Sequence, residues 1–258
     1  MFARHRLTIA RVLAALAGLF FVVATLPQAI SPWGAVTLSN MQGVHDPNLH
    51  RWSAALAGGP DLGGAAVLFY IAWRPQNVVL LLQWLALAVI IFLVANVPFV
   101  GVAVAVIAIP IVLVLAIHPE TRRLLTAPWS EGVSPLPLAL GALIAIALFF
   151  EGALAFSAQI RGADEVAANY DWASDGEHLV NIGVAALLSA VRKPGSMVLR
   201  LMVAAVLAFM GAAAITVPDN PGSWGTLGGV IAIVAALAFA LTAVYEWRQR
   251  TRMSAVAA

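Results

Sequence analysis

The sequence predicts an all-α, polytopic membrane protein with eight transmembrane helices. Three observations predict this fold class: the 258 residues are 62% hydrophobic and only 10% charged, the apolar residues form long runs, and the basic residues cluster between those runs. Soluble domains are about 45–50% apolar and about 25% charged, so this composition excludes a water-soluble enzyme and intrinsic disorder. A transmembrane β-barrel would instead show short alternating segments.

The predicted helices are eight apolar segments, each close to the length that crosses about 30 Å of hydrocarbon. The first follows a basic start but has no persuasive cleavage site, so we interpret it as a retained helix and not as a signal peptide. The second contains Pro60, and we expect one continuous, kinked helix there. A turn at Asn96, Val97 and Pro98 is expected between the third and the fourth. The predicted spans are 8–30, 53–73, 77–96, 99–117, 135–158, 175–191, 196–216 and 224–245.

The Lys and Arg residues predict the orientation. If the N-terminus is cytoplasmic, eleven of the fourteen lie on the inner side, Arg51 and Arg161 lie outside, and Arg200 lies within the seventh span. This asymmetry predicts an N-in, C-in topology, with which an even number of spans agrees. The alanine-rich, lysine-poor composition is typical of a high-GC bacterial genome, so we expect a multi-pass protein of the bacterial cytoplasmic (inner) membrane. The eleven are Arg4, Arg6, Arg11, Arg74, Arg122, Arg123, Arg192, Lys193, Arg248, Arg250 and Arg252.

An internal duplication is indicated by matches at an offset of 119 or 120 residues. Trp52 matches Trp172, Asp61 matches Asn181, and the segment 65–68 matches 185–188. Prolines after the matched helices keep the same spacing. We predict two parallel four-helix repeats, at 1–123 and 135–258, joined by a cytoplasmic linker at 124–134 and related by a pseudo-twofold axis along the membrane normal.

The first unit carries a family resemblance. It begins with an arginine-rich segment, has Gly18-Leu19-Phe20 in its first helix, and continues with a second helix that contains the segment 61–68 (DLGGAAVL) and ends at Arg74. Two closely linked apolar helices follow. This pattern resembles the four-helix DoxX-type membrane unit, here present twice. The resemblance implies the fold and a loosely defined link to membrane redox or quinone-associated proteins. The acidic residue that opens the family's second helix maps to Asp61, and the second unit departs from the pattern with Asn181.

Three polar residues are expected at a similar depth inside the apolar spans. Glu151 lies in the outer half of the fifth span, where a carboxylate is costly unless it faces the bundle or a wet cavity. Asp61 and Asn181 lie in the second and sixth spans. One hypothesis is that Glu151, Asp61 and Asn181 line a shared outward-facing, substrate-binding pocket. The alternative is interhelical hydrogen bonding, with a protonated Glu151 as donor.

Histidines and acids of the outer loops form a second candidate site. His45, Asp46 and His50 of the first loop, with Asp175, Glu177 and His178 of the second, supply ligand types that suit zinc, copper(II) or iron. The hypothesis is a divalent metal site that uses His45, His50, His178 and Glu177, and the alternative is a solvated loop kept out of the bilayer by its charges. Cysteine is absent, and the repeats do not repeat histidines within facing spans, so no haem or other resident cofactor is predicted.

Three functional hypotheses remain. The first is a membrane protein that binds or translocates a small or lipophilic solute in an outward-facing pocket between the repeats. The second is a non-catalytic subunit that scaffolds a redox or envelope complex, and the third is a metal-dependent membrane enzyme with an extracytoplasmic His/Asp/Glu site. The sequence favours a non-enzyme, because no Walker, Rossmann or Ser–His–Asp pattern occurs. Expected partners are the lipid bilayer and either a membrane protein or a second copy of the chain, and no nucleic acid.

Overall fold

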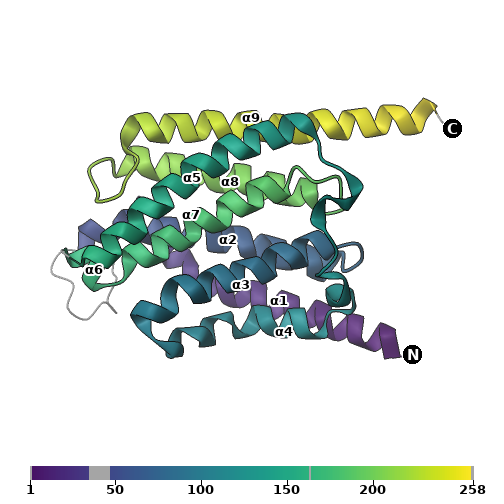
Figure 1. The fold of residues 1–258 in the computed structure, drawn as a ribbon, viewed down its shortest axis with the longest axis horizontal. Helices are drawn as coiled ribbons and strands as arrows, with labels where there is room; N and C mark the ends of the chain where they lie inside the picture. Colours follow the sequence, from purple (N-terminus) through teal and green to yellow (C-terminus); the bar gives the residue numbers. More distant parts are fainter. Residues whose placement is uncertain (1, 35–46, 163, 257–258) are drawn as a thin grey trace.

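The structure, a computed structural model, describes residues 2–34, 47–162 and 164–256, and this part of the chain is an all-α bundle. The helices lie side by side along the long axis, and both chain termini lie at one end of it (Figure 1). We call this end the termini end and the opposite end the distal end. The α-helices are α1 (Phe2–Ala29), α2 (Arg51–Trp73), α3 (Val79–Val100), α4 (Ile109–Ile117), α5 (Pro135–Arg161), α6 (Glu165–Ala168), α7 (Asp171–Leu188), α8 (Ser196–Thr216) and α9 (Gly225–Val256). Short 3₁₀ helices occupy Pro47–His50, Val102–Ala108, Pro119–Arg123 and Pro128–Glu131.

Six helical segments in the described residues are long and apolar enough to cross a membrane, which is compatible with an integral membrane protein. Two predicted spans differ from these six. The fourth is the shorter apolar segment Val102–Ile117, whose first half is a 3₁₀ helix. The sixth is α7, whose 18 residues include three carboxylates. The six segments are His5–Ala29, Asn48–Trp73, Val79–Val100, Pro135–Arg161, Ser196–Thr216 and Gly225–Glu246.

Two prolines, Pro60 and Pro98, both lie inside helices, although a turn was predicted at the second. Pro60 lies inside α2, which is continuous as predicted. The predicted turn at Pro98 is wrong, because Pro98 lies inside α3 and the chain turns three residues later. Gly101 makes that turn with a φ of +90°, a conformation that glycine adopts without strain.

Most helices pack in adjacent pairs. Two helices from each half of the chain, α2 and α3 with α7 and α8, form the centre of the bundle. The closest pairs are α1 with α2, α5 with α7, and α8 with α9. At the centre, α3 packs on α7 and α2 packs on α8. Small residues allow the closest approaches: a Cβ added to Gly211 of α8 would lie 2.6 Å from the carbonyl oxygen of Gly229 of α9.

The predicted linker is docked against the termini end. The carboxylate of Glu120 accepts hydrogen bonds from the backbone N–H groups of Asn77 (2.7 Å) and Val78 (2.8 Å), at the positive end of the α3 dipole. The Gln83 amide donates to the carbonyl oxygens of Leu124 (2.8 Å) and Thr126 (2.7 Å). These contacts hold the connection between the two halves in place.

A buried arginine links the last two helices. Arg200 of α8 is 1% exposed and donates to the carbonyl oxygen of Ser189 at 2.8 Å. Its guanidinium also lies 3.1 Å from the carboxylate of Glu246 on α9. The charge that the sequence places inside a span is therefore paired within the protein.

Candidate functional site

The helix α7 carries a polar stripe into the centre of the bundle. Its polar residues recur every three or four positions, so they share one face of the helix. They are Asp171, Ser174, Asp175, His178 and Asn181. This face is turned toward α2 and α3, on which α7 packs. Asp175 is 2% exposed and His178 is 8% exposed. Such burial of ionisable groups requires partners.

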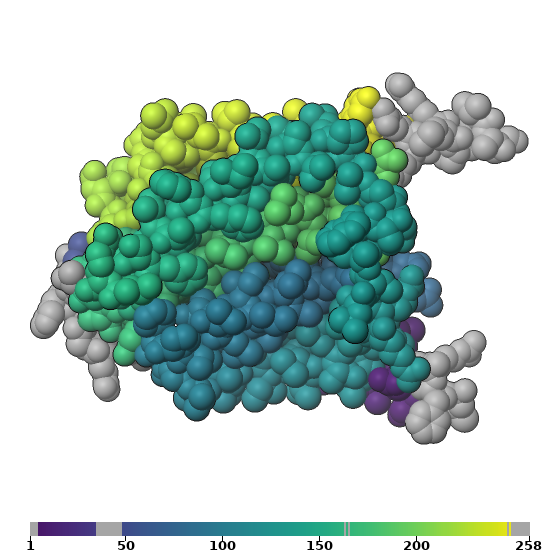
Figure 2. All heavy atoms as spheres, viewed as in Figure 1, coloured from purple at the N-terminus to yellow at the C-terminus, as the bar shows by residue number. Residues whose placement is uncertain are grey.

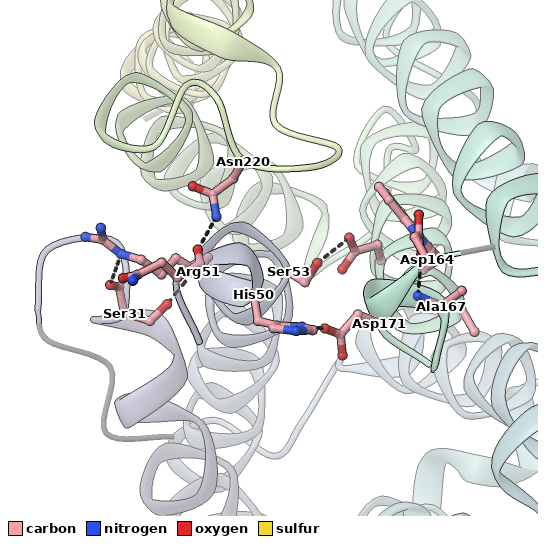
Figure 3. A network of polar contacts seen from close by, with 12 residues as sticks. Ser31, His50, Arg51, Ser53, Asp164, Ala167, Asp171 and Asn220 are labelled. Carbon is pink, nitrogen blue, oxygen red and sulfur yellow. Dashed lines mark hydrogen bonds and ion pairs between the residues drawn. The ribbon is translucent and has the colours of Figure 1, made fainter. Parts of the chain in front are cut away.

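Residues just before and within the first half of α2 supply three of these partners. The imidazole Nδ1 of His50 contacts the carboxylate of Asp171, and these two side chains point toward each other (Figure 3). Two turns deeper, the Nε2 of His178 lies 3.4 Å from Oδ1 of Asp61. Between these pairs, the hydroxyl of Ser53 donates to Oδ2 of Asp175 at 2.9 Å.

His178 occupies the centre of this cluster. Its Nδ1 lies 2.7 Å from the carbonyl oxygen of Ser174, and since a carbonyl oxygen only accepts, Nδ1 carries a hydrogen. The same nitrogen lies 3.1 Å from Oε2 of Glu177. Nε2, facing Asp61, is therefore the ring position at which a proton is gained or lost. Glu177 in turn accepts a 2.5 Å hydrogen bond from the amide of Asn181.

The cluster forms one wall of a cavity of about 230 Å³, which we call the polar pocket. A smaller space of about 60 Å³ adjoins it and reaches Trp84 and Leu68. The Asp61 side chain is 30% exposed, so it lies at the boundary between the cluster and the open space. The polar lining of the pocket is Gln28, Asp61, Ser174, Glu177, His178 and Asn181, and its apolar lining includes Phe21, Val89, Phe92, Ile107 and Ile111.

Several buried oxygen atoms of the cluster accept no hydrogen bond from the described residues. They are Oδ1 of Asp175, Oε2 of Glu177 and Oδ1 of Asn181. A buried acceptor without a donor costs about 1–3 kcal/mol. Glu177 and Asn181 line the polar pocket, whereas Asp175 does not, and Oε2 of Glu177 has His178 as its ion-pair partner. The pocket therefore offers the acceptor oxygens of Glu177 and Asn181, together with the Asp61 carboxylate, to whatever enters it.

The structure brings together two of the three residues predicted to line a shared pocket. Asp61 and Asn181 both line the polar pocket, whereas Glu151 lines a different cavity. Near Glu151, the buried face of α5 includes Leu148, Gly152 and Ala155, and Glu151 itself is not among the buried residues of the helix. It therefore faces a cavity of about 430 Å³ between α5, α8 and α9, which we call the Glu151 crevice.

The four predicted metal ligands are divided between separate places. Glu177 and His178 belong to the polar pocket, and His50 pairs with Asp171 at the distal end. His45 lies outside the described residues. Asp171 and His178 are seven residues apart on α7, about 10 Å along its axis, which separates the two imidazoles. Within the described residues, no group of three or more His, Asp or Glu side chains is arranged to hold a metal ion.

Sequence reasoning missed the structural roles of Asp171, Ser174 and Ser53. It assigned the acids of 171–177 to the outer surface because charge is costly in a membrane. The signal that was available is their helical spacing, which places Asp171, Asp175 and His178 on one face. No protein-family model matches the chain, and no curated protein or solved structure matches it.

Proposed function

We propose that the protein is a membrane protein that binds a small cationic solute, an organic amine, in the polar pocket. The observation that carries this proposal is the convergence of Asp61, Glu177 and Asn181 on one cavity, where two carboxylates share one imidazole and Oδ1 of Asn181 is buried without a donor. An ammonium group has three N–H donors and no acceptor, so it matches a surplus of acceptors.

The balance of charge in the pocket favours a cation. Two carboxylates, those of Asp61 and Glu177, face the single imidazole of His178. Even when this imidazole is protonated, two ionised carboxylates leave one negative charge in an apolar surrounding. A cationic solute neutralises that charge through hydrogen bonds that are stronger than neutral ones.

The apolar wall of the pocket selects for a solute with a hydrocarbon or aromatic body. Phe21, Phe92 and, in the adjoining space, Trp84 lie around the acceptors. Aromatic faces attract cations and also shield an apolar group from water. The volume lies below the roughly 300–1,000 Å³ of pockets for drug-sized ligands, so the solute is small.

The arrangement of helices supports the predicted duplication. A twofold axis that exchanges α2 with α7 and α3 with α8 also exchanges the α3–α7 contact with the α2–α8 contact, and both occur. With an N-in, C-in orientation in the bacterial inner membrane, the distal end faces outward. The polar pocket, lined by α1 to α4 of one repeat and by α7 of the other, then receives its solute from the extracytoplasmic side.

The test is titration of the full-length protein in lipid nanodiscs with benzylamine as probe, followed by calorimetry. We expect saturable binding that Glu177→Gln weakens about tenfold, equivalent to about 1.4 kcal/mol. Benzyl alcohol, which has a similar shape and no charge, is expected to bind at least about tenfold more weakly. Asp219→Asn, at an exposed distal position, is the matched control and leaves binding unchanged. Equal binding of the alcohol, or no saturable binding of the amine, contradicts the proposal.

A further inference from the structure

We propose that the residues on the distal part of the α2–α7 interface form a proton route from the distal surface to the polar pocket. The route runs from the His50–Asp171 pair to Asp175, which Ser53 holds, and then to His178, with the three α7 residues related by their helical spacing. Through it, a cation that enters the pocket is exchanged for a proton that leaves to the distal side. The exchange rests on the proposed function, whereas the route itself does not.

The geometry supplies a continuous series of proton-carrying groups. Asp171, Asp175 and His178 are spaced four and three residues apart on one face of α7, so their side chains are neighbours. Asp175, in the middle of the series, is the most buried member at 2% exposed, whereas the Asp171 side chain is 14% exposed and His178, at the pocket, is 8% exposed. The series therefore starts where water reaches the protein and ends at the pocket.

Each group has an atom suited to its step. In the first step an N–H bond of the protonated His178 imidazole breaks and an O–H bond forms on Asp175, which lies three residues away on the same face of α7 and whose Oδ1 is buried without a hydrogen-bond donor. Ser53 holds the other oxygen of Asp175, which fixes the carboxyl in the interface. The O–H bond of Asp175 then breaks, the His50–Asp171 pair accepts the proton, and this pair releases it to water. One proton leaves for each positive charge that enters.

The groups that face His178 are identified on every element around it. The carboxylate of Asp61 faces it from α2, and that of Glu177 comes from its own helix. The part of the pocket lining supplied by α1, α3, α4 and the 3₁₀ helix before α4 is apolar apart from Gln28 and has no ionisable side chain. The proton on His178 is therefore exchanged along the α2–α7 interface or through the pocket itself.

The route ends at the pocket and does not continue to the termini end. Beyond Asn181, α7 carries no ionisable residue as far as Leu188. The packing there is apolar, with Ile182, Ala185 and Leu68 each at most 1% exposed. Along α7, the series of ionisable side chains therefore leads from the pocket toward the distal end and not toward the termini end.

The first experiment follows proton uptake without any solute. The full-length protein in nanodiscs is subjected to a pH jump, and infrared difference spectroscopy records the C=O band of protonated carboxyl groups. Glu177→Gln identifies the pocket component of this band by removing it. We expect Asp175→Asn, which keeps an acceptor for Ser53 but cannot carry the proton, to slow that component at least tenfold. Asp219→Asn is the control and keeps the wild-type rate.

The same experiment can overturn the route. If Asp175→Asn retains the wild-type rate, protons enter through the pocket at Asp61 and the proposed route is wrong. If Asp175→Asn does not fold, Asp171→Asn takes its place with the same expected slowing, because it interrupts the series at its distal end.

A second experiment tests the exchange, with benzylamine as probe and a pH-indicator dye in weak buffer. We expect about one proton to be released for each amine bound, and release to lag behind binding in Asp175→Asn. Binding without proton release overturns the exchange and leaves the proposed function standing. Absence of binding overturns the proposed function and with it the exchange, while the infrared rates still decide the route.

Discussion

The polar pocket and the Glu151 crevice each contain a glutamate within the helical bundle, yet the two glutamates have opposite surroundings. Glu177 is buried, accepts a hydrogen bond from Asn181 and lies beside His178. Glu151 is half-buried, and among the described residues its side chain has no hydrogen-bond or ion-pair partner. The other residues that line its crevice, such as Leu148, Leu207 and Trp224, are apolar.

This difference shows that a carboxylate in an apolar helix does not by itself mark a built site. The polar pocket lies where α2 and α7 meet at the centre, and each acid there has partners from a second residue. The Glu151 crevice lies between α5, α8 and α9, and α5 and α9 lie at one edge of the bundle (Figures 1 and 2). Glu177 is part of a hydrogen-bonded network, whereas Glu151 raises the free energy of membrane insertion without a partner that compensates for it among the described residues.

The strongest test of this contrast is the same substitution at both positions. We expect Glu177→Leu to lower the free energy of unfolding by about 3 kcal/mol, because it leaves buried partners of an ion pair uncompensated. We expect Glu151→Leu to raise it by about 2 kcal/mol, because it removes an unpaired carboxylate from an apolar surface. Unfolding in mixed micelles, followed by circular dichroism, measures both. Effects of the same sign would end the distinction between the two sites.

A smaller effect is expected where the network holds Asp175. Ser53→Ala removes the only hydrogen bond that the described residues give to that carboxyl group, and we expect a loss of about 2 kcal/mol of stability. Thr216→Ala is the matched control, because its hydroxyl bonds to the Ala212 carbonyl at an exposed position, and we expect a change within about 0.5 kcal/mol. Similar losses for both variants would indicate that Asp175 does not depend on Ser53.

The smallest effect concerns an imidazole outside the network. Burial of His118, just after α4, lowers its pKa from the ordinary value of 6.5, against an opposing effect of the Glu120 carboxylate. Its Nδ1 accepts a hydrogen bond from the Glu120 N–H at 3.2 Å, which also requires the neutral form. The unfolded chain therefore binds more protons below pH 6.5, so this contribution to stability is complete above pH 6.5 and decreases as the pH falls.

The measurement is the free energy of unfolding between pH 7 and pH 5 for the wild type and for His118→Asn. Asparagine keeps an acceptor for the Glu120 N–H but does not titrate in this range. We expect the variant to show a smaller loss of stability on acidification than the wild type. An identical pH profile would mean that His118 is not the group responsible.

Much of the fold follows from the sequence, and part of the candidate site does as well. Hydrophobic runs predicted the apolar helices, including α8 with both of its boundaries at 196 and 216. Asp61 and Asn181 were predicted to lie at a similar depth, and both line the polar pocket. The end of α3 was predicted near Pro98 and lies at Val100 instead. A proline this close to the end of a helix removes one backbone hydrogen bond without ending the helix, which ends before Gly101.

The sequence by itself determined that the chain forms apolar helices, because the free energy of burying apolar groups depends mainly on composition and period. Only the tertiary structure decided which polar residues share a cavity. His178 lies beside Asp61, 117 residues away, and Glu151 does not, because helix rotation and pairing set the direction of each side chain. A hydrogen bond acts over about 3 Å, so these rotations decide which charges in the bundle are paired and which are left alone.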